Sequence, residues 1–215
     1  MLIRDRMTRN PVLCTADLPV TDAFDLMKKS RIRRMPVVDK NGKLVGIVSD
    51  QDLLRVTPSP ATTLSAYEIP YLLSKVKVND VMTKKVITVT EDTPVEEAAR
   101  IMADNKIGGL PVVDESNIVA GIITETDIFK TFLELIGARR PGVRITMIVK
   151  DKRGELARIG QAIADIGGNI IATVEVPGTD PSNYEVLLKV IGVTKDALVA
   201  ALKPMVERIT DVRES

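Results

Sequence analysis

The feature that most constrains this chain is an internal duplication. Residues 7–55 align with residues 82–130 without a gap at a constant shift of 75 positions, and 16 of the 49 paired positions are identical. The identities gather in short motifs at 7–8 and 82–83, 19–20 and 94–95, 36–39 and 111–114, and 46–47 and 121–122. A unit this short rarely buries its apolar face alone. We therefore expect the two copies to pack on each other and to form paired clefts related by a pseudo-twofold axis.

Each copy is expected to follow the order strand, helix, strand, strand, helix. In the first copy, Ala23, Leu26 and Met27 form an apolar stripe at helical spacing. The sequence Asp-Lys-Asn-Gly separates two apolar runs and is typical of a hairpin turn. The predicted elements are strands at 12–14, 35–38 and 44–48, a helix that opens at 17–20, the turn at 39–42 and a second helix that opens at 49–52.

This element order and the repeated pattern Gly-apolar-apolar-Ser/Thr-x-x-Asp, at 46–52 and 121–127, resemble the cystathionine-beta-synthase (CBS) domain. The resemblance implies a tandem pair that senses adenine nucleotides, with each cleft built from both copies. The first implied cleft contains Arg33, Arg34, Ser49, Asp52, Thr83, Ile87 and Gly109. The second contains Thr8, Val12, Thr124 and Asp127 and carries fewer cations.

The Ser/Thr-x-x-Asp motif has two interpretations. A hydroxyl three residues before a carboxylate at a helix start is close to a capping box, which needs no ligand. In the second interpretation the hydroxyl and the free amides face a phosphate, and the carboxylate accepts hydrogen bonds from ribose hydroxyls. The copies also differ, because Arg33-Arg34 in the first corresponds to Gly108-Gly109 in the second. Arginine offers bidentate geometry to a phosphate, whereas glycine offers only close backbone approach.

After residue 142 the chain changes character. The pattern predicts strands at 143–149, 169–176, 184–191 and 209–212 and helices at 155–166 and 195–206. This is the βαββαβ order of a ferredoxin-like sandwich. The segments 151–156 and 166–170 resemble the ACT domain, a small regulatory module that commonly binds amino acids. The resemblance implies contacts from Asp151, Gly154, Glu155, Asn169 and Ile170, although a helix cap and a turn explain the same glycines.

Two CBS repeats followed by an ACT domain resemble the acetoin-utilisation AcuB-type family. The fold class expected is α+β. The expected domains are a first CBS domain at 1–58, a linker with a helix at 59–76, a second CBS domain at 77–138, a linker at 139–142 and an ACT domain at 143–215. In the first linker, 65–68 forms a capping box, Pro70 complicates the helix, and 71–73 are expected to pack on the CBS pair.

Composition excludes several kinds of chemistry. Thirty basic and 29 acidic residues leave a net charge of +1, which does not favour nucleic-acid binding. The chain has no histidine, so Ser-His or Cys-His catalysis and histidine-ligated metals are excluded, and no catalytic or metal-binding residues are predicted. The one cysteine, Cys14, is expected to be a core residue. No apolar run reaches membrane-span length and no signal-peptide core is visible, so a cytoplasmic location is expected.

The sequence therefore predicts a non-catalytic regulatory sensor with an adenine nucleotide as its regulatory ligand, no other cofactor, and an amino acid as a second ligand at the ACT domain. The protein is also expected to form a homodimer and to act on a protein partner that the sequence does not name. Two alternatives remain open at this point: an enzyme of acetoin or nucleotide metabolism, and a scaffold with vestigial pockets.

Overall fold

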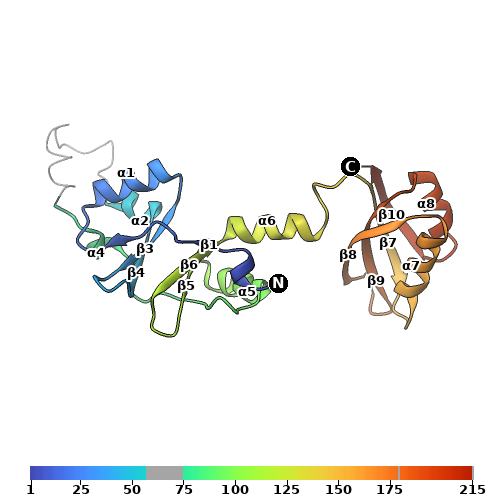
Figure 1. The fold of residues 1–215 in the computed structure, drawn as a ribbon. Coiled ribbons are helices and arrows are strands. Elements are labelled where there is room, and N and C mark those ends of the chain that lie inside the picture. The colour runs from blue at the N-terminus through green and yellow to red at the C-terminus, as the bar shows by residue number, and fades with distance from the viewer. Residues whose placement is uncertain (57–74, 179, 215) are drawn as a thin grey trace. The chain divides into compact units, whose positions relative to one another are not determined.

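The computed structural model describes residues 1–56, 75–178 and 180–214. It contains an N-terminal unit, Met1–Ile128, and a C-terminal unit, Phe129–Ser215 (Figure 1). The helix expected around residues 65–73 lies outside the described residues.

The duplication holds element by element in the N-terminal unit. The first copy contains the 3-10 helix η1 (Ile3–Asp5), β1 (Thr8–Arg9), β2 (Cys14–Thr15), α1 (Val20–Ser30), β3 (Arg34–Val38), β4 (Leu44–Ser49) and α2 (Asp50–Arg55). The second contains α4 (Val78–Val81), α5 (Val95–Asn105), β5 (Gly109–Val113), β6 (Val119–Thr124) and α6 (Glu125–Leu135). The predicted strand-helix-strand-strand-helix order is confirmed in the first copy; in the second, the strand before α5 is reduced to an isolated bridge between Val89 and Val112. The first strand is shorter than expected and begins at Cys14, and β1 was not predicted.

The correspondence extends to backbone details. Arg31 and Lys106, which are 75 positions apart, both end a helix in the left-handed region at φ 54°. The register of β3 on β4 shifts between Val37 and Val38, and that of β5 on β6 shifts at the corresponding pair. The two copies therefore share their backbone geometry as well as their sequence motifs.

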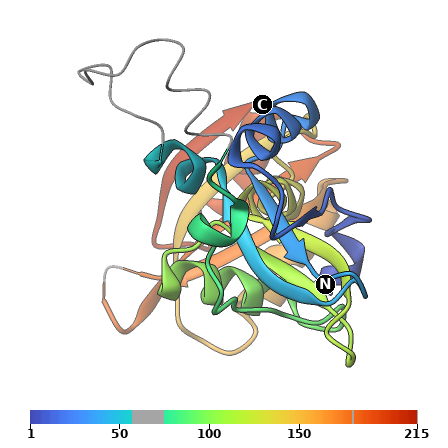
Figure 2. The ribbon, with the colours of Figure 1, turned by 90° about the vertical axis from the view of Figure 1, so that its left-hand side faces the viewer.

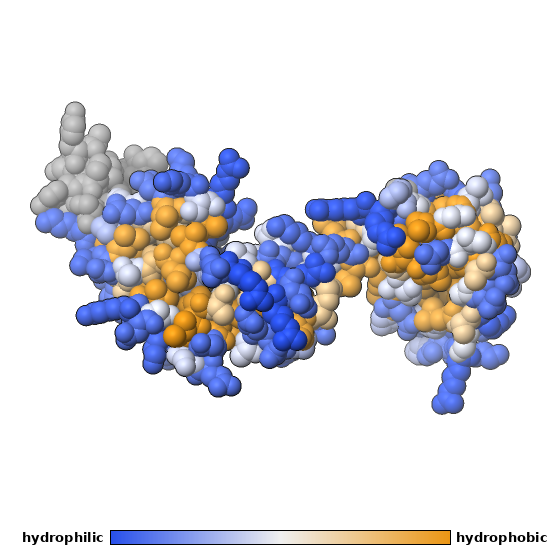
Figure 3. Space-filling view, viewed as in Figure 1, coloured by the Kyte–Doolittle hydropathy of each residue, from blue (hydrophilic) through white to orange (hydrophobic). Residues whose placement is uncertain are grey.

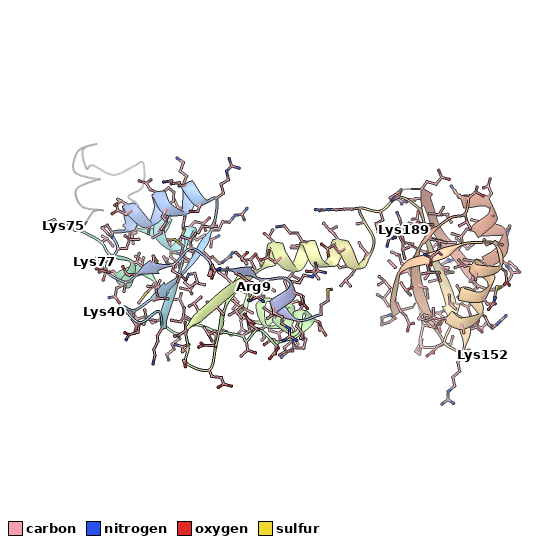
Figure 4. The ribbon with its side chains drawn as sticks, in the orientation of Figure 1. Arg9, Lys40, Lys75, Lys77, Lys152 and Lys189 are labelled. Atoms are coloured by element: carbon pink, nitrogen blue, oxygen red, sulfur yellow. The ribbon has the colours of Figure 1, made fainter. Side chains whose placement is uncertain are left out.

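The N-terminal arm of each copy pairs with the sheet of the other copy. We call residues 2–9 the first arm and residues 77–84 the second arm; Arg9 and Lys77, labelled in Figure 4, belong to them. Thr8 in β1 pairs with Ile122 in β6. Thr83 pairs with Ile47 in β4 through two backbone hydrogen bonds of 2.9 and 3.0 Å. This exchange brings residues of both copies to each cleft.

The exchanged arms approach two glycines closely. A Cβ atom on Gly46 would lie 2.5 Å from the sulfur of Met82, and one on Gly121 would lie 2.5 Å from the sulfur of Met7 and 3.0 Å from the carbonyl oxygen of Thr8. A side chain at either glycine would therefore displace the arm. This accounts for the matching Met-Thr and Gly-Ile motifs of the duplication.

Two small sheets and two matching cores result. The sheets have strand orders β2-β3-β4 and β1-β6-β5, and Figure 2 shows the strands of the two copies next to each other. The first core includes Ala23, Met27, Val37 and Val78; the second includes their counterparts Ala98, Met102, Val112 and Ile3. Val78 and Ile3 are arm residues, so each arm completes the core of the other copy. Burial of these apolar side chains favours keeping the copies together.

The C-terminal unit has the element order βαββαβ. Its elements are β7 (Val143–Lys150), α7 (Glu155–Asp165), β8 (Asn169–Pro177), β9 (Asn183–Ile191), α8 (Lys195–Leu202) and β10 (Arg208–Glu214). The sheet is antiparallel with strand order β10-β7-β9-β8. Alternate residues of β7 and β9 pack with Ile159, Ile163, Leu198 and Leu202 of the helices. Helix α8 ends at Leu202 and not at 206, because Pro204 has no amide hydrogen to continue it.

Candidate functional site

The first of the two clefts, cleft I, lies where the second arm meets the end of β4. It has a volume of about 340 Å³, within the range of small-ligand sites. Its lining residues come from both copies: Arg34, Ile47, Ser49, Asp50, Gln51, Asp52, Arg55, Thr83, Lys85, Val86, Ile87, Lys106, Ile107, Gly108 and Gly109. The structure thus brings together six of the seven residues expected for the first cleft.

Cleft II is the pseudo-symmetric counterpart, with a volume of about 380 Å³. It is lined by Thr8, Asn10, Pro11, Val12, Arg31, Ile32, Arg33, Arg34, Gly108, Ile122, Thr124, Glu125, Thr126 and Asp127. All four residues expected for the second cleft are present. Two of its fourteen lining residues, Arg34 and Gly108, also line cleft I. Each of the other twelve lies 75 residues from a lining position of cleft I.

Arg33 lies in cleft II and not, as expected, in cleft I. Arg33 lies just before β3 and lines cleft II, whereas Arg34 begins β3 and lines both clefts. The expectation treated the two arginines as one basic group, although only Arg34 belongs to the strand.

The Ser/Thr-x-x-Asp motif forms the same local structure in both clefts. The Asp52 Oδ2 atom accepts hydrogen bonds from the backbone N–H of Ser49 at 2.9 Å and from its hydroxyl at 2.6 Å. The Asp127 Oδ2 atom accepts the equivalent bonds from Thr124 at 3.0 and 2.7 Å. The capping interpretation is therefore correct for one carboxylate oxygen. The second oxygen of Asp52, Oδ1, faces Arg55 at 3.7 Å, and its carboxylate lines the cleft.

Both clefts combine cations with these carboxylates. Cleft I contains the cations Arg34, Arg55, Lys85 and Lys106 and the carboxylates Asp50 and Asp52. Cleft II contains Arg31, Arg33 and Arg34 with Glu125 and Asp127. Cleft I therefore holds one more cation, as expected, but through residues that sequence reasoning did not select. Lys106 could have been found from the duplication, since it is the counterpart of Arg31.

In the described part of the chain, no group of three or more histidine, cysteine, aspartate and glutamate side chains is arranged to hold a metal ion. Cys14 is buried in the first core, and burial raises the pKa of its thiol to about 11. Among the described helices none has the length and apolar character needed to cross a membrane.

The residues expected for an ACT-type ligand do not share one hollow in the C-terminal unit. Asp151 lines an acidic hollow together with Glu175, Asp180, Asn183 and Tyr184. Burial, reinforced by the carboxylates of Glu175, Glu155 and Asp151, raises the pKa of Tyr184. Glu155 is buried and its carboxylate accepts two hydrogen bonds from Arg158, at 2.9 and 3.1 Å.

Three other expected residues, Gly154, Asn169 and Ile170, lie elsewhere in the unit. Gly154 precedes α7 with φ 86°, in the left-handed region that favours glycine. Asn169 and Ile170 begin the edge strand β8. The hollow's lining, as far as the structure describes it, includes none of them.

Comparison with known proteins identifies the duplicated unit. A family model for the CBS domain matches residues 3–59 and again residues 78–134. The chain belongs to the CBS-domain family. An uncharacterised CBS relative from Methanocaldococcus jannaschii is 34% identical over 155 residues, which are 62% of this chain and 92% of the relative.

Solved structures of CBS pairs superpose on the same part of the chain. The CBS pair of protein MJ0100, in complex with 5′-methylthioadenosine and S-adenosyl-L-methionine, is 32% identical with a TM-score of 0.51, covering 61% of this chain and 99% of that one. CBSX2 in complex with AMP is 33% identical with a TM-score of 0.52, covering 65% and 98%. A Vibrio cholerae protein described as an acetoin utilization protein (AcuB) is 34% identical with a TM-score of 0.53, covering 65% and 95%.

Proposed function

We propose that this CBS-domain protein is a non-catalytic regulatory sensor that binds adenine nucleotides in clefts I and II. The observation that carries the proposal is the repeated geometry of the clefts. In each one, a hydroxyl and a carboxylate from the start of a helix line the cleft together with cations and an apolar residue that follows the arm, Ile87 in cleft I and Val12 in cleft II. The complexes of the MJ0100 pair and of CBSX2 with adenine-containing ligands support it.

The proposed contacts follow from the chemistry of each group. The carboxylates of Asp52 and Asp127 accept hydrogen bonds from ribose hydroxyls. The nearby cations contact phosphate, Ser49 and Thr124 hold the two carboxylates in place, and Ile87 and Val12 pack against the adenine ring. Arginine is suited to the phosphate because its guanidinium donates in a bidentate geometry.

The experiment separates ligand binding from helix capping. Asp52→Asn and Asp127→Asn are expected to weaken AMP binding by roughly 1–3 kcal/mol each, the cost of a lost hydrogen bond to a charged group. The matched control is Asp80→Asn. Asp80 occupies the same capping position in α4, where its Oδ2 atom accepts from the backbone N–H of Lys77 at 2.9 Å, and it lines neither cleft.

Calorimetric titration of the wild type and the three variants with AMP provides the measurement. Equal affinities for the wild type, Asp52→Asn and Asp127→Asn would overturn the proposed site. Recovery of unchanged AMP after prolonged incubation is expected of a sensor. Conversion of AMP would instead support an enzyme.

We further propose that the C-terminal unit is a ferredoxin-like ACT domain and that the protein is an AcuB-type regulator that works as a homodimer. The βαββαβ order supports the ACT assignment, and the likeness to the Vibrio cholerae protein, which covers 65% of this chain, supports the AcuB-type assignment. Its acidic hollow favours the ammonium end of an amino acid over the carboxylate end, because Asp151, Glu175 and Asp180 carry negative charge. A thermal-shift screen of amino acids tests it, since a ligand at about 100 times its Kd adds about 2.7 kcal/mol of stability.

A further inference from the structure

One arginine is shared by the two clefts. Arg34 and Gly108 are the two residues found in the lining of both cleft I and cleft II. The duplication does not supply a second arginine, because the counterpart of Arg34 is Gly109. A single guanidinium therefore lies at the boundary between two otherwise equivalent sites.

The geometry at Gly108 shows where this guanidinium lies. A Cβ atom on Gly108 would lie 2.6 Å from the Arg34 Cζ atom and closer still to its Nη2 atom. The same point is 2.6 Å from the Glu125 Oε2 atom. Arg34 thus extends from β3 of the first copy over the backbone of the second, into space that any side chain at position 108 would fill.

The guanidinium of Arg34 has no partner of its own. Among the residues that the structure describes, it makes no hydrogen bond and no ion pair within 4.0 Å. Arg34 is only partly exposed. Its five N–H donors are therefore available to an anion in either cleft.

The charge balance decides how the two clefts interact. Together the clefts contain six cations and four carboxylates, with Arg34 counted once. A phosphate monoester carries a charge of about −1.5 to −2 near pH 7. One phosphate therefore neutralises the excess of two positive charges, and a second phosphate meets a site without excess positive charge and with its shared arginine engaged.

We propose that Arg34 makes clefts I and II antagonistic toward phosphate-bearing ligands, whereas ligands without a phosphate bind the two clefts independently. This inference rests on the proposed function and specifies its regulation. It predicts that the two clefts bind one phosphorylated nucleotide, or one nucleotide and one uncharged nucleoside, more readily than they bind two nucleotides.

The test compares AMP with adenosine by calorimetric titration of the full chain. Asp52→Ala and Asp127→Ala each weaken one cleft, so the tighter site of each variant gives the affinity of the other cleft while the weakened one is empty. In the wild type, the second AMP is expected to bind its cleft at least roughly tenfold more weakly than AMP binds that cleft when the other is empty. This is the ratio for a lost charge-assisted hydrogen bond. For adenosine, the two values are expected to agree within about twofold, because no charge competes for Arg34.

Two variants test the assignment to Arg34. Arg34→Ala removes the shared cation, so the AMP antagonism is expected to fall to about twofold or less, and the first AMP is expected to bind more weakly. Gly108→Ala keeps the arginine but places a methyl group where its guanidinium lies, so it is expected to reduce the antagonism as well. The matched control is Arg33→Ala, which removes a neighbouring cation that lines cleft II but not cleft I. It is expected to weaken AMP binding there and to retain the antagonism.

The outcomes separate this inference from the proposed function. If AMP binds both clefts with independent affinities, or binds the second more tightly, the nucleotide sensor stands and the antagonism is wrong. Antagonism that is equal for adenosine, or that persists in Arg34→Ala, also overturns the role of the shared arginine. If AMP binds neither cleft, the proposed function fails together with the inference.

Discussion

At the scale of single residues, the structural role of the Asp52 and Asp127 carboxylates is compatible with the ligand role that we propose for them. Oδ2 of each is held by the Ser or Thr three residues earlier, which fixes the orientation of the carboxylate. A fixed carboxylate loses little side-chain entropy when a ligand binds. The capping box therefore prepares the site instead of competing with it.

Cys14 provides a test of the first core. Because burial raises its pKa to about 11, the thiolate fraction at pH 8 is on the order of one in a thousand. The side chain is also 6% exposed. We expect a disulfide reagent to label Cys14 very slowly at pH 8 in the native protein and rapidly in denaturing urea. Fast native labelling would show that β2 does not pack as described.

At the scale of elements, the sequence predicted the parts that local patterns encode. Two apolar runs separated by a turn located β3 and β4, and the shift of 75 transferred them to β5 and β6. The strand β1 could not be predicted in this way, because its two residues pair with the other copy and carry no pattern of their own. The position of Arg33 was mistaken because the sequence does not show that this residue lies just before β3, outside the strand that contains Arg34.

The exchange of arms gives a prediction at this scale. Gly121→Ala places a methyl group 2.5 Å from the sulfur of Met7 and 3.0 Å from the backbone oxygen of Thr8. The arm has to move, so we expect a loss of about 1–3 kcal/mol of unfolding free energy, as for other overpacked cores. Urea denaturation followed by circular dichroism measures it.

The control for this prediction is Gly160→Ala in α7. A Cβ atom on Gly160 meets nothing within 4 Å. Alanine is the better helix former, so this variant is expected to be more stable by about 0.5–1 kcal/mol. If both variants change the unfolding free energy in the same direction, then close packing of the arm is not the reason that position 121 requires glycine.

At the scale of the whole molecule, the duplication predicted two paired clefts, and the resemblance to CBS domains implied some of the residues that line each one. Ten of the eleven residues implied for nucleotide binding lie in the expected cleft. The C-terminal unit was less predictable, because its implied ligand residues have no repeat to anchor them. Loop residues such as Gly154 and edge-strand residues such as Asn169 satisfy turn and sheet geometry, which a sequence pattern does not distinguish from ligand contacts.

Exposed apolar side chains on the helices bear on the assembly of the whole molecule. Leu54 on α2 is 54% exposed, and its counterpart Phe129 on α6 is 67% exposed. Phe132 on α6 is also half exposed. Figure 3 shows hydrophobic residues gathered on one face of the N-terminal unit, in the region of α2, β3 and β4. Clustered apolar exposure of this kind is typical of protein interfaces.

We therefore expect the protein to be a homodimer that buries these helical faces. An isologous dimer uses the same surface on both chains, and a net charge of +1 offers little repulsion against it.

Sedimentation equilibrium at micromolar concentration should give twice the 23.5 kDa mass of one chain. The double variant Leu54→Ser/Phe129→Ser should lower that mass toward one chain, because it removes the largest apolar contacts from the interface. The matched control is Leu156→Ser, which changes an exposed leucine of α7 and should leave the dimer intact. A wild-type mass of one chain would contradict the dimer, and dissociation by Leu156→Ser alone would place the interface on α7.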